Sequence, residues 1–194
     1  MEIAADPLLA IAEAFARARS EEPVDASAMA LASADARGRP SVRMVLLRGV
    51  DDRGLVFFTN YLSRKGQELT DNPHAALCIH WAKAERQVRA EGPVVRVSVE
   101  ESDAYFATRP RGSQLGAWAS AQSQPIESRQ ALLERLHAVE ARFGDGPVPR
   151  PEHWGGFRLE PERIELWHGQ RDRLHERVLY TRQDGAWDTS ILMP

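Results

Sequence analysis

The chain has 194 residues, of which 43% are hydrophobic and 27% charged, and its formal net charge is −3. This length fits one folded domain with a sizeable core, and the small net charge gives no general attraction to nucleic acid or to an anionic membrane. The single cysteine, Cys78, excludes an internal disulfide, and no apolar run approaches the roughly 20 residues of a membrane span. Because acids stand near the start, where a signal peptide needs cations, we expect a cytoplasmic protein.

Capping residues and helical spacing predict four helices. They begin at Asp6, Ser63, Ser98 and Ser128 and end near residues 22, 72, 110 and 143. Pro7 suits the first position of the first helix, and Pro110 ends or kinks the third. The helices lie far apart in the sequence, so we expect them at the periphery of another structure.

That structure is predicted to be an antiparallel sheet. Strands are expected over 28–34, 41–50, 55–59, 74–81, 86–97, 156–160, 163–168, 173–180 and 186–192. Short strands joined by turns, without regular strand–helix alternation, favour a small barrel over a doubly wound sheet. We therefore predict a mainly β fold in one domain, with an N-terminal helix over 1–22 and a barrel with inserted helices over 23–194.

Several common catalytic motifs are missing from the sequence. It contains no GxGxxG, Walker loop, HExxH or GxSxG, and its six histidines are scattered without close metal-ligand pairs. We expect no metal site. Difficult chemistry, if the protein performs any, is expected from an organic cofactor.

The segment SRKGQEL, which starts at Ser63, is the first candidate site. Ser63 begins a helix, so Arg64 and Lys65 fall in its first turn. The helix dipole is positive there, and two cations are unfavourable unless an anion lies nearby. Free amides, the dipole and two cations together suit a phosphate group, although a solvated pair of charges explains them equally well.

The strand SVRMVLLRG has an arginine toward each end. Its period places Arg43, Val45 and Leu47 on one face and Met44, Leu46 and Arg48 on the other. Solvation of the strand ends is enough to explain these arginines when they are taken alone.

Residues 101–124, ESDAYFATRPRGSQLGAWASAQSQ, hold more hydrogen-bonding side chains than a core helix needs. Tyr105 and Arg109 are four residues apart and share a helix face, which Ser113 would extend if the helix continued past Pro110. A phenol, a guanidinium and a hydroxyl in a row can hold a phosphate ester. An amphipathic surface helix is the alternative.

A second basic cluster, RDRLHER, covers residues 171–177. In a strand, Arg173, His175 and Arg177 project to one face. Two permanent cations beside an imidazole form an anion site with a titratable group. An exposed polar strand face is the alternative.

Six segments together resemble one enzyme family. They are RMVLLRG, FFTNYLSRKGQEL, ERQVRAEG, SDAYFATRPRGSQLGAWASAQSQPI, WGGFRLEPERIELWHGQRDRLHER and ILMP. In order and spacing they are similar to the pyridoxine/pyridoxamine 5′-phosphate oxidases, from about Asp6 to Pro194. The resemblance implies a split β-barrel that binds FMN and forms a homodimer with FMN at the subunit interface. It also implies oxidation of pyridoxine or pyridoxamine 5′-phosphate by oxygen to pyridoxal 5′-phosphate and hydrogen peroxide, with ammonia from the amine.

The resemblance assigns a set of residues to FMN. They are Arg43, Met44, Val45, Leu46, Leu47 and Arg48, then Phe58 and Thr59, then Arg64 and Lys65 at the phosphate, Gln87 at the flavin ring, and Gln122, Ser123, Trp167 and Arg177. Of these, Gln122 and Ser123 are expected to come from the partner subunit.

The resemblance also implies how substrate is held. The substrate phosphate is assigned to Arg48, Tyr105, Arg109 and Ser113, and the pyridine ring to Arg173 and His175. The implied reaction is hydride transfer from the substrate 4′ carbon to the flavin, with the protein orienting the rings and stabilising charge. Arg173 is expected to guide the substrate hydroxyl or amine and assist proton removal, and His175 to orient the ring.

The chain departs from the family pattern in three ways. Arg48 stands where lysine is usual, and Ile191 stands where arginine is usual. An N-terminal lid carried by many members is expected to be absent or replaced here. Two other functions stay open: a related flavin oxidase for another ring substrate, as in phenazine biosynthesis, and a non-catalytic carrier or sensor of FMN or pyridoxal phosphate.

Overall fold

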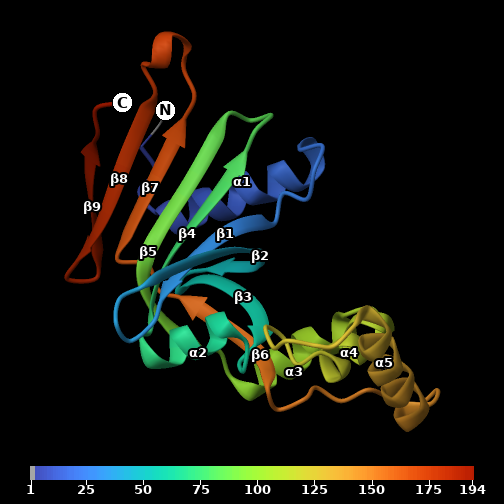
Figure 1. Cartoon of the computed structure of the whole chain (residues 1–194). Coiled ribbons are helices and arrows are strands. Elements are labelled where there is room, and N and C mark those ends of the chain that lie inside the picture. Colours follow the sequence, from blue (N-terminus) through green and yellow to red (C-terminus); the bar gives the residue numbers. More distant parts are fainter. Residues whose placement is uncertain (1–2) are drawn as a thin grey trace.

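The computed structural model describes residues 3–194 (Figure 1). The strands are β1 (Ala28–Ala34), β2 (Pro40–Asp51), β3 (Gly54–Asn60), β4 (His74–Trp81), β5 (Arg86–Arg96), β6 (Trp154–Leu159), β7 (Arg163–His168), β8 (Glu176–Gln183) and β9 (Ala186–Ile191). The helices are α1 (Pro7–Glu21), α2 (Arg64–Asp71), α3 (Val99–Thr108), α4 (Arg111–Ala119) and α5 (Arg129–Phe143), with a 3-10 turn, η1 (Arg171–Arg173). All predicted strands are present in this part of the chain.

Six of the strands close into an antiparallel barrel. Their order is β4-β1-β2-β3-β6-β5, and β4 pairs with β5 to complete the circle. The strands β7, β8 and β9 continue the sheet outward from β5. The predicted antiparallel split barrel with peripheral helices is therefore confirmed, while the prediction of a single domain over 1–194 stays a prediction.

The long strand β5 belongs to both parts of the sheet. Residues 86–91 pair with β7, whereas residues 94–96 pair with β6. Gly92 lies where the pairing changes, and a Cβ on it would come within 2.9 Å of the backbone nitrogen of Glu162. The turn between β6 and β7 approaches too closely for any side chain at this position.

The barrel interior holds the main hydrophobic core, and α1 covers it on one side. Asp6 caps α1 by accepting a hydrogen bond from the Leu8 amide at 2.8 Å, as predicted. Leu8 and Ile11 are buried against the barrel, and the Phe15 ring stacks on Trp81 with their centroids 6.3 Å apart. None of the helices in residues 3–194 is long and apolar enough to cross a membrane.

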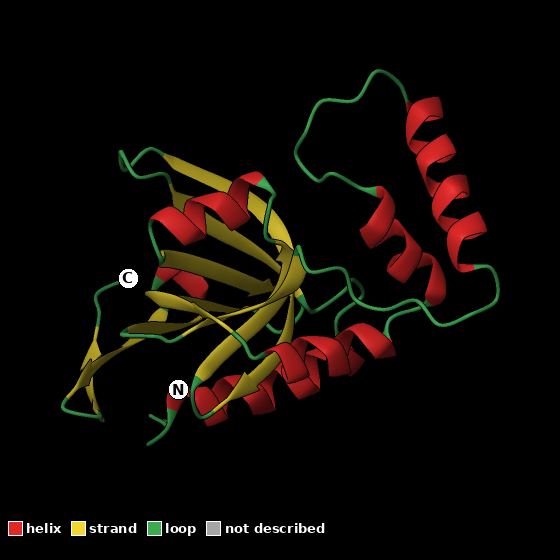
Figure 2. Cartoon of the chain, turned by 90° about the horizontal axis from the view of Figure 1, so that it is seen from below, coloured by secondary structure: helices red, strands yellow, loops and turns green. Residues whose placement is uncertain are grey.

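A second hydrophobic cluster joins α3, α4 and α5 to the end of the barrel. It is built on Phe106, Leu115, Val148 and Trp154. In Figure 2 the pair α4 and α5 stands apart from the strands, connected by a long loop. This helical lobe leaves a space beside the barrel in which a ligand can be held.

The predicted third helix differs from the structure. It ends at Thr108, and Arg109 is its C-cap with extended backbone angles (φ −73°, ψ 145°). Pro110 has no amide hydrogen to continue the helix, so α4 starts afresh at Arg111. Tyr105, Arg109 and Ser113 therefore do not share one continuous helix face.

Candidate active site

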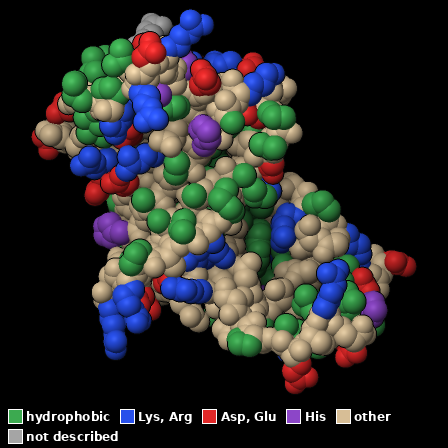
Figure 3. All heavy atoms as spheres, turned by 45° about the horizontal axis from the view of Figure 1, so that its top comes forward, with side chains coloured by type: hydrophobic (Ala, Val, Ile, Leu, Met, Phe, Trp, Pro, Cys, Tyr) green, Lys and Arg blue, Asp and Glu red, His purple; other side chains and the backbone are tan. Residues whose placement is uncertain are grey.

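A cavity of about 430 Å³ opens between the barrel and the helical lobe. Its lining residues come from β2, β3, α2, α3, α4, the loop after α4 and the start of β6. They are Met44, Val45, Leu46, Arg48, Phe58, Thr59, Asn60, Lys65, Tyr105, Arg109, Ser113, Gly116, Ala117, Ser120, Gln122 and Trp154. Figure 3 shows a hollow in the surface where hydrophobic and basic side chains gather.

The wall from β2 follows the predicted alternation. Leu47 points into the core at 1% exposure, whereas Met44, Leu46 and Arg48 are exposed and line the cavity. The structure thus brings most of this predicted FMN segment to the cavity. The side chain of Leu47 supports the barrel, so a contact of this residue with FMN, which stays a prediction, would have to come from its backbone.

Lys65 lines the cavity. Its side chain is buried, and Nζ donates to Thr59 Oγ1 at 3.0 Å and to Gln122 Oε1 at 2.9 Å. Burial, and then the charge of Arg43, lower the pKa of Lys65 to about 8, against the opposing effect of Glu68. A buried amine with neutral partners gains strongly when an anion enters the cavity.

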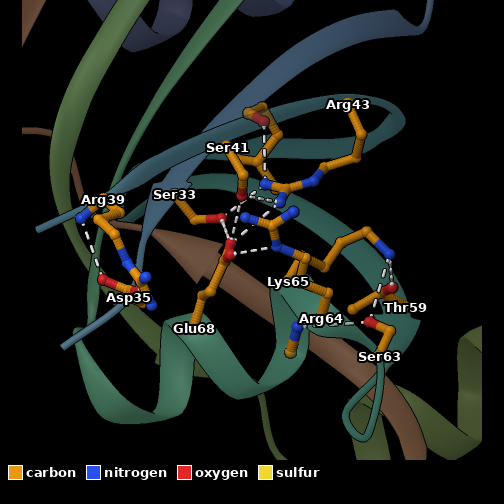
Figure 4. A network of polar contacts seen from close by, with 12 residues as sticks. Ser33, Asp35, Arg39, Ser41, Arg43, Thr59, Ser63, Arg64, Lys65 and Glu68 are labelled. Carbon is orange, nitrogen blue, oxygen red and sulfur yellow. Dashed lines mark hydrogen bonds and ion pairs between the residues drawn. The ribbon is translucent and has the colours of Figure 1, made fainter. Parts of the chain in front are cut away.

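Behind Lys65 a buried carboxylate, Glu68, collects the neighbouring polar groups. Glu68 accepts hydrogen bonds from Ser33 and Ser41, each at 2.6 Å, and pairs with Arg43 at 3.0 Å and Arg64 at 2.8 Å. Figure 4 shows these groups converging on Glu68. Burial alone would raise the pKa of Glu68, but the hydrogen bonds from the two serines and two arginines outweigh it and hold that pKa at about 2.

This network changes the interpretation of two predicted cations. Arg43 and Arg64 do not line the cavity in this chain, because Glu68 binds both of them. In Figure 4 Lys65 points away from Glu68, toward Thr59 and Ser63. The first turn of α2 is predicted to supply two cations to the site. Arg64 pairs with Glu68, so only Lys65 is supplied to the cavity from this turn.

Arg109 lines the cavity as well, together with Tyr105, Ser113 and Arg48. Its Nη1 atom is buried without a hydrogen-bond partner. Burial lowers the pKa of Arg109, and Arg48 adds to this effect. Because Arg109 lines the cavity and none of the carboxylates in residues 3–194 pairs with it, this part of the cavity also favours an anionic ligand.

Gln122 corrects an expectation about the partner subunit. Its side chain accepts hydrogen bonds from Lys65 and Thr59 of its own chain. Because α4 ends at Ala119, the following loop can bring Gln122 back over β3. Ser123, the next residue, is exposed with φ +71° and does not line this cavity.

The basic cluster at residues 171–177 also differs from its prediction. The strand β8 starts only at Glu176, and η1 forms the tip of the β7–β8 hairpin. Asp172 and Arg173 have positive φ angles of 59° and 60°, which turn the chain between the strands. Arg173 and His175 therefore lie in the turn, and the predicted alternation of three residues along a strand is wrong.

Contacts within the hairpin hold two of its candidate residues. The Gln170 amide donates to His175 Nδ1 at 3.1 Å, and the His175 ring lies 4.7 Å from that of Trp167. Arg177 pairs with Glu165 at 2.8 Å. Arg173 is exposed at the tip.

A second cavity, of about 780 Å³, lies between α1 and the β5–β7 part of the sheet. Gln87 and Trp167 line it. Figure 1 shows the β7–β8 hairpin at one end of the molecule and α2, α3 and α4 at the other. The predicted site residues thus form two groups, one at the first cavity and one at the second cavity and the β7–β8 hairpin. A single chain does not bring these groups together.

The chemistry of the first cavity is clear from its lining. It contains the cations Arg48, Lys65 and Arg109, and no carboxylate among the described residues. Apolar and aromatic side chains, among them Met44, Leu46 and Phe58, line the cavity with these cations. The donor set suits ring systems that carry phosphate groups. Residues 3–194 contain no group of three or more His, Cys, Asp or Glu side chains placed to hold a metal ion.

Comparison with known proteins decides the family. Residues 16–143 match the pyridoxamine 5′-phosphate oxidase family, and residues 154–194 match the pyridoxine 5′-phosphate oxidase C-terminal dimerisation region. The chain belongs to the pyridoxamine 5′-phosphate oxidase family. Its C-terminal strands β6 to β9 form the dimerisation region of that family.

Relatives and solved structures agree with this membership. The chain is 58% identical to the pyridoxine/pyridoxamine 5′-phosphate oxidase of Paraburkholderia phymatum over 181 residues, which cover 93% of this chain and 85% of the relative. It is 52% identical to that of Gluconobacter oxydans over 194 residues, which cover 100% of this chain and 97% of the relative. The structure of PhzG from Burkholderia lata 383, in complex with tetrahydrophenazine-1-carboxylic acid, superposes with a TM-score of 0.93 at 32% identity, covering 100% of this chain and 95% of that one. An FMN-binding, pyridoxamine 5′-phosphate oxidase-related protein of Nostoc punctiforme shares the fold at a TM-score of 0.77 and 22% identity, covering 100% of both chains.

Three residues of this family member escaped the sequence analysis. Glu68 could have been suspected from its spacing of four from Arg64, which predicts an ion pair on a helix. Asn60 and Trp154 line the cavity from strand ends, and no local pattern distinguishes them from core residues. Among the departures from the family pattern, Arg48 lies at the cavity and Ile191 is exposed at the end of β9.

Proposed function

We propose that the protein oxidises pyridoxine 5′-phosphate or pyridoxamine 5′-phosphate to pyridoxal 5′-phosphate with FMN as its cofactor. Oxygen accepts the electrons and becomes hydrogen peroxide, and the amine substrate also releases ammonia. The observation that carries the proposal is one cavity lined by two cations, the buried Lys65 and the half-buried Arg109, with which no carboxylate of the described residues forms an ion pair. Two phosphate-bearing rings need two such cations. The family and the relatives with this activity give the same answer.

The residues present fit FMN. Lys65, Thr59 and Gln122 can meet its phosphate, and the outward face of β2 offers Met44 and Leu46 to its ring. Arg43 and Arg64 stabilise this end through Glu68. Bound FMN would supply the acceptor for a hydride from the substrate 4′ carbon.

The substrate phosphate is proposed to bind at Arg109, Tyr105, Ser113 and Arg48. The Arg109 guanidinium lines the cavity, and none of the carboxylates in residues 3–194 pairs with it, so it can form charge-assisted hydrogen bonds with a phosphate. Binding there holds the substrate in one orientation for the reaction.

Arg173 and His175 are proposed to act from the partner subunit. They lie on the β7–β8 hairpin within the dimerisation region, which Figure 1 shows at the opposite end of the molecule from α2, α3 and α4. In a homodimer this hairpin can reach the partner's cavity. Arg173 would then hold the substrate hydroxyl or amine and assist loss of its proton, and His175 would orient the ring. Gln87, Trp167 and Arg177 would complete the cofactor site from the same side.

A second candidate is oxidation of a different ring substrate. The superposition with PhzG, whose structure contains tetrahydrophenazine-1-carboxylic acid, favours it. That ligand carries one carboxylate and no phosphate, so it would give Arg109 a weaker partner than a phosphorylated substrate does.

The cytoplasm remains the proposed compartment. The chain has one cysteine and can form no internal disulfide, which suits a reducing compartment.

The test is the visible spectrum of FMN-loaded protein without oxygen. Adding pyridoxine 5′-phosphate should bleach the flavin absorbance, and admitting air should restore it with formation of hydrogen peroxide. Tetrahydrophenazine-1-carboxylic acid serves as the comparison. Bleaching by that compound alone would replace the proposal with the second candidate, and no bleaching by either compound or by pyridoxamine 5′-phosphate would overturn both.

A further inference from the structure

The half-buried Arg109 guanidinium is held by aromatic rings and not by an acid. Among residues 3–194 no carboxylate pairs with it, and its Nη1 atom has no hydrogen-bond partner. Instead its Cζ atom lies 4.5 Å from the ring centroid of Trp154 and 5.4 Å from that of Phe106. The negative faces of aromatic rings attract a cation at these distances, and more strongly when water is excluded.

Trp154 belongs to a group of three stacked rings. Phe58 lies 4.0 Å from Tyr105 and 5.5 Å from Trp154, with interplanar angles of 17° and 11°. All three rings are nearly parallel, since Tyr105 and Trp154 differ by 8°. The stack therefore fixes the plane of the indole against which Arg109 rests.

The backbone around Trp154 holds the indole in place. Its amide donates to Pro151 at 3.0 Å, and its carbonyl accepts from Arg150 Nη1 at 2.7 Å. The next two residues are glycines, and a Cβ on Gly156 would come within 2.8 Å of Phe58 Cε1. The absence of side chains there lets the Phe58 ring lie flat against the strand and close the stack.

We propose that Trp154 is a positioning residue that determines preference for a phosphorylated substrate. Its indole face holds the Arg109 guanidinium in the cavity wall, where none of the carboxylates in residues 3–194 pairs with it and competes with a phosphate. A carboxylate partner would neutralise the cation and weaken binding of a dianion. The inference rests on the proposed function only in placing the substrate phosphate at Arg109.

The experiment measures binding of 4-deoxypyridoxine 5′-phosphate, an analogue that lacks the oxidisable group, to FMN-loaded protein by equilibrium dialysis. Trp154→Leu should weaken its binding about tenfold, the effect of losing a desolvated cation–π contact. Trp154→Phe, which keeps a ring, should recover most of the affinity. Binding of 4-deoxypyridoxine, which has no phosphate, should change by less than about twofold in either variant.

Two controls separate positioning from general loosening of the lobe. Trp118 belongs to the same hydrophobic cluster and carries Arg142 on its ring at 4.7 Å, but it is not among the rings that contact Arg109. Trp118→Leu should leave the preference for the phosphorylated analogue intact. In the background of Arg109→Met, Trp154→Leu should cost little further affinity, because the two residues act as one unit.

The outcomes are decisive in both directions. Equal weakening for the two analogues, the same pattern in Trp118→Leu, or additive losses in the double variant would each overturn the inference. Turnover is measured separately, and Trp154→Leu should raise KM for pyridoxine 5′-phosphate with little change in kcat. If the wild-type protein binds the phosphorylated analogue but does not oxidise pyridoxine 5′-phosphate, the proposed function fails while the dialysis still tests Trp154.

Discussion

The ammonium group of Lys65 is buried and its hydrogen-bond partners are neutral, so its protonation depends on the charge of the ligand in the cavity. Burial and the charge of Arg43 lower its pKa to about 8 in the protein without ligand. A bound phosphate dianion favours the protonated amine and raises that pKa again. Above about pH 8, binding of FMN therefore requires the Lys65 amine to take up a proton. Below that pH the amine is already protonated, and binding does not depend on its titration.

We expect the affinity for FMN to fall as the pH rises above about 8, by up to tenfold per unit, since each binding event must then take up a proton. The phosphate itself does not titrate in this range, because its second pKa is about 6. The measurement is quenching of FMN fluorescence at pH 7 to 9.5. Lys65→Arg is the control, since a permanent cation should give a flat profile. An equally steep profile in that variant would assign the effect to another group.

At the scale of elements, the site depends on how closely β6 packs against β3 and α3. Gly155 and Gly156 follow Trp154, and a Cβ on Gly156 would meet Val97 Cγ2 at 2.5 Å as well as the Phe58 ring. Both neighbours are held in the packed junction between the barrel and the lobe. A methyl group at this position must displace a cavity wall.

Gly156→Ala is expected to lower the free energy of unfolding by about 1–3 kcal/mol, because the added methyl overpacks the junction. It should also weaken binding of the phosphorylated analogue, since Phe58 supports the stack behind Arg109. Urea denaturation of the protein without FMN measures the first effect. Gly49→Ala is the matched strand glycine, where the nearest atom would be Val56 Cβ at an ordinary 3.7 Å. Comparable losses in both variants would mean that glycine matters here for backbone freedom and not for space.

At the scale of the whole molecule, the two groups of site residues lie at opposite ends of one chain (Figure 1). The match of residues 154–194 to a dimerisation region supports a homodimer, which can join the cavity of one protomer to the hairpin of its partner. Each protomer would then complete the other's site, and neither would be active alone.

Complementation between two inactive variants tests this arrangement. Arg109→Met disables the cavity half and Arg173→Ala the hairpin half; the second should keep FMN but lose turnover by about 100-fold or more. Mixed dimers retain one site in which both halves are intact, so a random mixture should regain about one quarter of wild-type activity. A mixture as inactive as its parents would place both halves of the site within one chain.

The sequence by itself determined the barrel, because strand alternation, turn residues and helix caps are local signals. It also determined the family and the types of residue that are proposed to bind the phosphates of FMN and substrate. Only the tertiary structure decided which cations are free: Glu68 binds Arg43 and Arg64, while no carboxylate in residues 3–194 forms an ion pair with Lys65 or Arg109. It also placed Arg173 and His175 in a turn, and Trp154 behind Arg109. Apart from the Arg64–Glu68 pair, whose residues lie four apart on α2, these ion pairs and ring contacts join residues far apart in the chain, so spacing along the sequence does not record them.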